Sequence, residues 1–520
     1  MFVSSLLLPT FDRLSVVCLS AAFCAVLVRL LFRRFPSNAT GNVVPPGPRL
    51  RYAFLRRYPE RSLHAWAAKY GPLFSVQMGS QLVVVISHTN IARDLLVTNG
   101  SIFSSRKPYF MKNQTILRGR AITASEYNQT WRKHRRLAMQ LLTHAAVVEY
   151  ASVFQFEAAT LIHTLYRDSE GGKKPINPAK AAGRFALNNM LTVSFGMRTD
   201  SIENQLVERA LELAMEFMDL TGPWSNAIDF IELIQYLPTR MRTRGHKLHD
   251  DLISVYGQMI ADVERRLEKD ESDVPDCLVR TLLGIRDSEK LDHEDICMLS
   301  AVFTLGGVHS TFGLIQWFIA VMANYGIVQR TAQSEIDTIV GRDRMPTAMD
   351  EPQLQYVRSV IKEVQRLHAP FWMATPHYST EDFVYQGMYI PKHTLVVLNC
   401  YTIHHDPIRY PNPDEFDPSR YADDTLSCTE SAKLPDAMKR DHWTFGAGRR
   451  ICPGMTVAER ELWLAISGLL WAFDISAVPG EPVSLEEYEG LSGRTPIPFR
   501  AYLRPRHVGV GEVLQKELEQ

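Results

Sequence analysis

Apolar positions recur with a helical period along most of the chain. Spacings of three and four between apolar residues predict amphipathic helices at 61–70, 128–142, 203–220, 247–267, 356–367 and 458–473. Short apolar runs bounded by turn residues predict a strand hairpin, 73–78 and 82–86 across Gly79-Ser80-Gln81, and a further strand at 395–400. The stretch 496–505 has strand-and-turn character. The pattern therefore predicts a mainly α fold with small β-sheets, as one large domain over 51–520.

One segment breaks the amphipathic pattern. Residues 296–329 contain no Asp, Glu, Lys or Arg, yet Gly306 and Gly307 lie near the middle and Ser310 and Thr311 follow them. A transmembrane helix is one interpretation. Paired glycines and hydroxyl groups at the midpoint favour a buried central helix against which a ligand packs, because mid-helix glycine costs about 1 kcal/mol.

The N-terminal region has a different pattern. An uncharged run, 14–28, is followed by several arginines, while only Arg13 precedes it. A cleaved secretory signal would carry its positive charges before the run. We therefore expect residues 1–35 to be an uncleaved membrane anchor, with the remainder in the cytosol. The stretch 36–50 is rich in proline and predicts a stiff hinge.

Composition and charge exclude several classes of protein. Apolar residues make up 46% and charged residues 22% of the chain, which excludes disorder and coiled coil. The 57 basic and 57 acidic residues cancel, so there is no general electrostatic attraction to nucleic acid. Seven cysteines are scattered and form no C-x-x-C pair, which argues against a disulfide scaffold or a structural zinc site.

Cys452 has the most suggestive surroundings of these cysteines. The stretch 445–454 reads FGAGRRICPG and leads into a predicted helix. Amides at a helix start stabilise a thiolate, and small residues let the backbone approach a flat partner. The residues alone leave three possibilities open, namely a nucleophile, a haem ligand and a buried inert cysteine.

This stretch fulfils F-x-x-G-x-R-x-C-x-G and resembles the haem loop of cytochrome P450. Glu363 and Arg366 are similar to the E-x-x-R pair of that family, and Arg420 resembles the arginine that completes its ion network. Trp131 and Arg135 match its W-x-x-x-R helix. The anchor, hinge and charge-free helix follow in family order, so the resemblance covers nearly the whole chain. The haem loop is also similar to that of microsomal enzymes of filamentous fungi.

The resemblance implies the cytochrome P450 fold and a haem b cofactor. Cys452 is then the axial ligand, which favours O–O cleavage, and Phe445 shields its sulfur. Arginine forks suit carboxylates, so the haem propionates are assigned to Arg450, Trp131, Arg135 and His377. Gly448 and Gly454 complete the cofactor-binding set. For Glu363, Arg366 and Arg420 we expect a buried scaffold network. His404 and His405 are expected to be surface or loop histidines.

The central helix departs from the family pattern. An acid followed by threonine is usual there, whereas this chain has His309 and Ser310, followed by Thr311. These three residues are the catalytic candidates, because a serine hydroxyl offers the same donor and acceptor as threonine. His309 could relay protons or pack in a distorted helix, and both interpretations stay open. The departure puts ordinary hydroxylation in question.

The substrate-facing segments of the family correspond to about 103–121, 371–373 and 491–496. The first two are aromatic and apolar, which predicts a bulky hydrophobic substrate, and no anchor for a charged substrate is evident. The resemblance implies NADPH as electron source through a separate cytochrome P450 reductase, with a single-pass location in the endoplasmic reticulum membrane. The leading hypothesis is a monooxygenase of a hydrophobic natural product. Oxidative coupling, desaturation or rearrangement without oxygen insertion is the alternative, and a non-catalytic haem protein is the third.

Overall fold

The structure is a computed structural model that describes residues 36–520 except 53–57, 202–204, 223–225, 271, 273, 491 and 520. The predicted anchor, 1–35, lies outside the described residues. The hinge 36–50 is described, and it packs on the main sheet where the Ser75 amide donates to the Pro46 carbonyl at 2.8 Å.

Four sheets are present in the described part of the chain. The main sheet has the order β1-β2-β3-β7-β4. Its strands are β1 (Arg51–Tyr52), β2 (Leu73–Met78), β3 (Gln81–Ile86), β7 (Leu395–Leu398) and β4 (His377–Tyr378). The two-stranded sheets are β5 (Phe383–Tyr385) with β6 (Met388–Ile390), β8 (Phe473–Ala477) with β11 (Ala501–Pro505), and β9 (Tyr488–Glu489) with β10 (Thr495–Pro496).

The strand hairpin is confirmed, and its second strand runs parallel to β7. Leu73 pairs with Ile86 across the hairpin, and Val83 pairs with Leu395 in the parallel ladder. Both β3 and β7 are apolar at nearly every position, as strands covered on both faces are. The sheet therefore joins the first hundred residues to a segment near residue 400.

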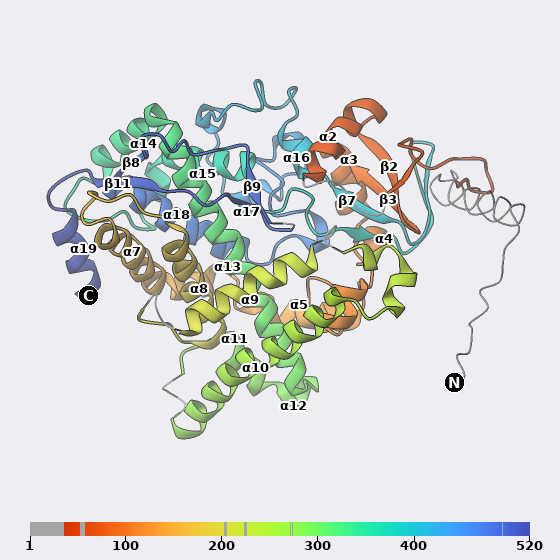
Figure 1. Cartoon of the computed structure of the whole chain (residues 1–520), viewed down its shortest axis with the longest axis horizontal. Helices are drawn as coiled ribbons and strands as arrows, with labels where there is room; N and C mark the ends of the chain where they lie inside the picture. Colours follow the sequence, from red (N-terminus) through yellow and green to blue (C-terminus); the bar gives the residue numbers. More distant parts are fainter. Residues whose placement is uncertain are drawn as a thin grey trace, which may run out of the picture.

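Helices make up most of the molecule (Figure 1). The longer ones are α2 (Pro59–Tyr70), α5 (Gln129–Gln140), α7 (Ala151–Asp168), α8 (Ala179–Phe195), α9 (Gln205–Thr221), α10 (Arg240–Lys269), α13 (His293–Asn324), α14 (Gly326–Ile339), α15 (Gln355–Leu367), α18 (Met455–Ala472) and α19 (Val510–Glu519). The shorter elements used below are the π-helices η1 (Arg93–Thr98) and η2 (Phe110–Ile116), the 3-10 helices η4 (Glu232–Tyr236) and η9 (Gly448–Arg450), and the helices α16 (Cys400–His404) and α17 (Cys428–Ser431).

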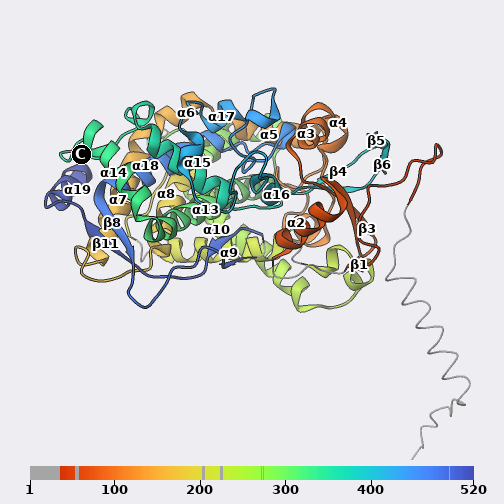
Figure 2. The same ribbon diagram turned by 90° about the horizontal axis from the view of Figure 1, so that it is seen from above.

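The main sheet and α2 form one end of the molecule, and β8, β11 and α19 lie at the other (Figure 2). The charge-free segment forms α13, which a capping box of Asp292 and Asp295 starts. Although α13 is long and apolar enough to cross a membrane, it packs against α8, α10 and α18 and is largely buried. The predicted buried central helix is confirmed.

Several predicted bounds differ from those observed. The charge-free helix ends at Asn324, because Tyr325 leaves the helical conformation and α14 follows as a separate helix. The strand predicted at 395–400 ends at Leu398, since the Asn399 side chain caps α16. Periodicity did not reveal α8, which is buried on nearly all sides and has no polar face.

Candidate active site

A cavity lies between α13 and the loop that precedes α18. Its wall comprises residues of η2, the C-terminal part of α9, the middle of α13, the segment 370–377 and the loop 444–454 with the first turns of α18. Much of this wall is apolar, through side chains that include Phe217, Met218, Phe303, Leu314 and Phe371. The walls predicted at 103–121 and 371–373 are thus brought together, although Trp372 is buried away from the cavity.

Cys452 lines this cavity at the entry to α18. Its amide donates to the Phe445 carbonyl at 2.9 Å, which closes the loop, and Phe445 and Gly454 line the cavity beside it. Burial raises the pKa of the Cys452 thiol, whereas the Gly454 amide and the Arg135 charge act to lower it. Gly448 does not line the cavity. A Cβ there would lie 2.0 Å from the Leu96 carbonyl oxygen, so Gly448 lets the loop pack on η1.

The residues predicted to hold propionates gather on one side. Arg135, Arg450 and His377 line the cavity. The Arg450 guanidinium donates to the carbonyls of Ser104, Ile122 and Ser125 and stacks 4.0 Å from the Trp131 ring centroid. Trp131 itself lies behind Arg450, with its indole N–H on the Ile122 carbonyl at 2.9 Å. His377 is held by a 2.7 Å contact between its Nδ1 and the Phe103 carbonyl.

Three further cavity-lining cations, Arg106, Lys107 and Lys112, were not predicted from the sequence. Arg106 donates to the carbonyls of Thr375 and Pro376, and its Nε has no partner. Burial lowers the pKa of Arg106 to about 9 and that of Arg450 to about 8. Lys107 and Lys112 are the other two cations, and Lys112 belongs to η2. The signal was the presence of five basic residues within the stretch 103–121, three of which line the cavity.

The central helix turns its three candidate residues in two directions. Ser310 and Thr311 line the cavity, and the Ser310 hydroxyl donates to the Gly306 carbonyl at 3.0 Å. His309 faces away, because its ring packs directly on the backbone at Gly493, where a Cβ would lie 2.2 Å from His309 Cε1. Burial lowers the pKa of His309 to about 4. His309 therefore packs against the backbone. Its ring does not line the cavity, which a proton relay would require.

The predicted scaffold network is confirmed. Arg366 donates twice to the Glu363 carboxylate, at 2.7 Å each, and Arg420 donates to the same carboxylate at 3.2 Å. Both Glu363 and Arg366 are fully buried. The remaining Arg366 donors bind the carbonyls of His404, Pro413 and Glu415, so the pair ties α15 to the chain that precedes the cysteine loop.

The expectation for His404 and His405 was wrong. Both are buried, with His404 at the end of α16 and His405 directly after it. His404 Nδ1 lies 2.9 Å from the Arg366 carbonyl, and its Nε2 accepts from the Trp443 amide at 2.8 Å. His405 stacks on Tyr401 with ring centroids 4.1 Å apart. The polar residues that flank the two histidines favoured a surface position. In the structure, both rings contact backbone groups inside the fold.

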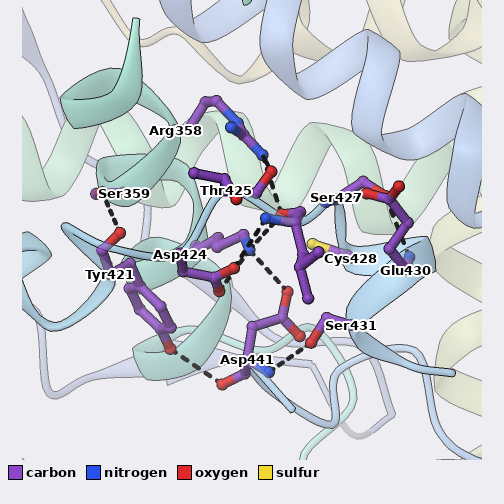
Figure 3. Close-up of polar contacts among 12 residues, drawn as sticks. Arg358, Ser359, Tyr421, Asp424, Thr425, Ser427, Cys428, Glu430, Ser431 and Asp441 are labelled. Carbon is purple, nitrogen blue, oxygen red and sulfur yellow. Dashed lines mark hydrogen bonds and ion pairs between the residues drawn. The ribbon is translucent and has the colours of Figure 1, made fainter. Parts of the chain in front are cut away.

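A second cysteine belongs to a separate buried cluster. Ligand-type atoms of Cys428, Asp441 and His442 lie within 4.8 Å of one another. The Lys362 ammonium already pairs with Asp424 at 2.7 Å and with Asp441 at 3.3 Å. Figure 3 shows Asp424, Cys428 and Asp441 within one network of polar contacts that ties the chain near α17 together. Burial raises the Cys428 pKa well above the usual range, and Cys428 does not line the cavity.

The chemistry of the cavity fits a haem. Buried arginines without a carboxylate partner require an anion, because an uncompensated buried charge is costly. Arg106, Arg135 and Arg450 form no ion pair with an acidic residue in the described chain. They lie on a cavity that also presents one cysteine sulfur. A flat group with two carboxylates and a thiolate-binding iron matches this donor set.

Comparison with known proteins agrees with this reading of the site. The family model described as Cytochrome P450 matches residues 45–500. Cytochrome P450 monooxygenase atE of Aspergillus terreus is 31% identical over 490 residues, which cover 91% of this chain and 90% of that protein. Cytochrome P450 monooxygenase polD of Polytolypa hystricis is 30% identical, with 92% and 93% covered. Cytochrome P450 monooxygenase virE of Hypocrea virens is also 30% identical, with 95% and 91% covered.

The family match and the monooxygenase relatives thus place the chain among haem-dependent oxidoreductases that act with incorporation of molecular oxygen. The chain belongs to the cytochrome P450 family, and the relatives named above are fungal monooxygenases. The resemblance predicted from the stretch 445–454 is confirmed, as is the mainly helical fold with small sheets.

Proposed function

We propose that this protein is a haem-thiolate monooxygenase that oxidises a hydrophobic natural product, with electrons from NADPH delivered by a separate reductase. One observation carries the proposal. Of the cysteines in the described chain, Cys452 lines the cavity, whereas Cys277, Cys297, Cys400 and Cys428 are buried elsewhere. Cys452 would be the iron ligand, and the backbone bond from its amide to the Phe445 carbonyl fixes the sulfur in place.

The two carboxylates of haem b would be held by the basic wall. Arg106, Arg135, Arg450 and His377 line the cavity, and Arg450 lies close enough to Arg106 and Arg135 for their charges to interact. Trp131 supports the Arg450 guanidinium from behind by a cation–π contact. Bidentate carboxylate binding would use the N–H groups of Arg450 and Arg135 that backbone carbonyls leave free.

When bound, haem iron supplies dioxygen activation, and the chain supplies position, exclusion of water and protons. Phe445 would cover the Cys452 sulfur. The apolar wall formed by Phe217, Phe303 and Phe371 would hold the substrate and keep water away. The Ser310 hydroxyl, fixed on the Gly306 carbonyl, would hold a proton at the point where oxygen is reduced.

A second function has a specific observation in its favour. His309 stands at the position of the usual acid and faces Gly493, so this helix turn offers no carboxylate to the cavity. The alternative is oxidative coupling, desaturation or rearrangement without oxygen insertion, and of these a redox-neutral rearrangement would need no protons for the reduction of dioxygen. Turnover under labelled dioxygen separates the two, because hydroxylation puts label in the product and the alternative leaves the product unlabelled.

Membrane attachment is part of the proposal. Leu233, Tyr236 and Leu237 in and after η4 are 76%, 82% and 53% exposed. The chain just before η4 contacts the β2–β3 turn, since the Ser80 amide donates to the Phe230 carbonyl at 3.2 Å. These apolar side chains would lie on the bilayer beside a single-pass anchor in the endoplasmic reticulum, with the catalytic domain in the cytosol. Release by alkaline carbonate would contradict the anchor.

The ligand assignment is tested by two matched cysteine variants. The reduced protein with carbon monoxide should show the red-shifted absorption of thiolate-bound haem. Cys452→Ser should lose this band, and Cys428→Ser should keep it, because Cys428 lies in the Lys362 cluster outside the cavity. Loss of the band in Cys428→Ser with retention in Cys452→Ser would overturn the assignment.

A further inference from the structure

Lys112 is a cation in the cavity wall that lacks a counter-charge. It belongs to η2, and its ammonium lies 6.0 Å from the ring centroid of Phe217 on α9. Within the described chain, Lys112 Nζ has no hydrogen bond and no ion pair. Lys107, which lines the same cavity, differs in this respect because it donates to the Asp229 carbonyl at 2.9 Å and feels the Asp229 carboxylate.

The charges around the cavity leave an excess of positive charge. One acidic side chain lines it, and that side chain, Glu461, is neutral at pH 7 because burial raises its pKa to about 8. Asp229 balances Lys107. The basic side chains that line the cavity are Arg106, Lys107, Lys112, Arg135 and Arg450. Without Lys107, four positive side chains remain. The two carboxylates of haem b would offset two of these charges, and a Cys452 thiolate would offset the charge of the ferric ring. Two positive charges on the cavity wall are then left without a counter-charge.

Lys112 lies close enough to Arg106 to interact with its charge, but it differs from the arginines in what holds it. Arg106 and Arg450 are tied to backbone carbonyls at Thr375, Pro376 and Ser104. The Lys112 ammonium instead lies near the Phe217 ring of α9, in the apolar wall that would hold the substrate. Burial and the charge of Arg106 lower the pKa of Lys112 to about 8, so the amine remains mainly protonated at pH 7.

A protonated amine in an apolar wall is costly unless its ligand brings the opposite charge. An anionic substrate group would remove that cost, and the single ammonium among aromatic side chains suits one carboxylate on an otherwise apolar body. We propose that Lys112 selects substrates that are apolar carboxylic acids, and that it binds their carboxylate while the body lies against Phe217 and Phe371. This inference rests on the proposed function, and it replaces the expectation that the substrate has no charged anchor.

Binding of matched acids and esters tests the proposal. The haem-loaded protein would be titrated by calorimetry with dodecanoate, 2-naphthoate and abietate, each beside its methyl ester. At least one acid should bind more tightly than its ester. Lys112→Met should reduce that preference by roughly 30-fold or more, because a desolvated charge pair loses a partner. Lys112→Arg should retain the preference, and Lys69→Met, the same change on the exposed face of α2, should leave it unaltered.

The result can also overturn the inference. No preference for any of the three acids, or an equal preference in Lys112→Met, would do so. A loss of haem content in Lys112→Met with an unchanged acid preference would assign Lys112 to the haem carboxylates instead, which also overturns it. The carbon monoxide spectrum of each variant is recorded alongside, so that failure of the haem-thiolate assignment is seen separately from failure of substrate selection.

Discussion

The Thr311 hydroxyl donates to the Glu461 carboxyl at 2.9 Å and so links α13 to α18 beside the cavity. Both side chains are buried, and the second oxygen of Glu461 has no partner in the described chain. Desolvation raises the pKa of Glu461 to about 8. The central helix is therefore joined to the helix that follows Cys452 through a carboxyl group that carries no charge at neutral pH.

Glu461→Gln should change how stability depends on pH. The folded protein keeps the Glu461 proton up to a pKa of about 8, whereas the unfolded chain loses it near 4.5. The folded state thus binds more protons in this window, and stability falls as pH rises. Relative to Glu461→Gln, the free energy of unfolding of the wild type should drop by about 1.4 kcal/mol per pH unit between roughly pH 5 and 8. Urea unfolding at several pH values measures this, and parallel curves would contradict it.

The glycine pair of α13 offers a matched test of packing. A Cβ on Gly307 would lie 2.2 Å from the Met190 sulfur, whereas a Cβ on Gly306 would meet nothing within 4 Å. Gly306→Ala should raise the melting temperature slightly, because alanine favours the helix by about 1 kcal/mol. Gly307→Ala should lower the melting temperature, because overpacking costs about 1–3 kcal/mol of stability. Adding Met190→Ala should recover part of that loss, and no recovery would show that the clash lies elsewhere.

Arg366→Lys should be strongly destabilising. Lysine has three donors and no planar fork, so it could not replace both bonds to Glu363 and the three bonds to backbone carbonyls. We expect a loss of about 3–5 kcal/mol, with reduced haem content in purified protein. Arg93→Lys, in a half-exposed pair with Asp94, should cost about 1 kcal/mol or less. Equal stability of the two variants would contradict the network role.

Ser310→Ala should uncouple the reaction. Removal of the hydroxyl takes away the cavity-facing donor on this turn of α13, while Thr311 stays engaged with Glu461. The share of NADPH consumption that yields product should fall severalfold, and released peroxide should rise. Ser310→Thr, which restores the hydroxyl, should remain coupled. Unchanged coupling in Ser310→Ala would exclude Ser310 as the proton donor.

His309→Gln should leave the pH profile of turnover unchanged. The ring packs on Gly493, and burial holds the pKa of His309 at about 4, so the ring stays neutral over the working range. The variant should show its effect in thermal stability instead, because glutamine fills this site poorly. A shift in the acidic limb of the pH profile would restore the relay interpretation.

The order of chemical motifs could be predicted from the sequence because each is compact along the chain. The cysteine loop is fixed by glycine conformations and one backbone bond, and the pair Glu363 and Arg366 needs only one helix turn. Short-range spacing specifies such features fully. The strand hairpin followed from the same kind of local pattern.

Features that depend on three-dimensional neighbours could not be predicted in this way. Which side His309 faces is decided by Gly493, nearly two hundred residues away. The burial of His404 depends on Arg366 and Trp443. The lack of a counter-charge at Lys112 is visible only once α9 covers it. In each case the side chain is ordinary in its local sequence, and the packing of distant segments gives it its role.

The parallel pairing of β3 with β7 has a consequence for synthesis of the protein. Val83 and Leu395 are more than three hundred residues apart, so β3 leaves the ribosome long before its partner exists. Throughout translation of the helical body, an apolar strand edge stays open to other chains. Any truncated product that ends before β7 keeps this edge unpaired and open to aggregation.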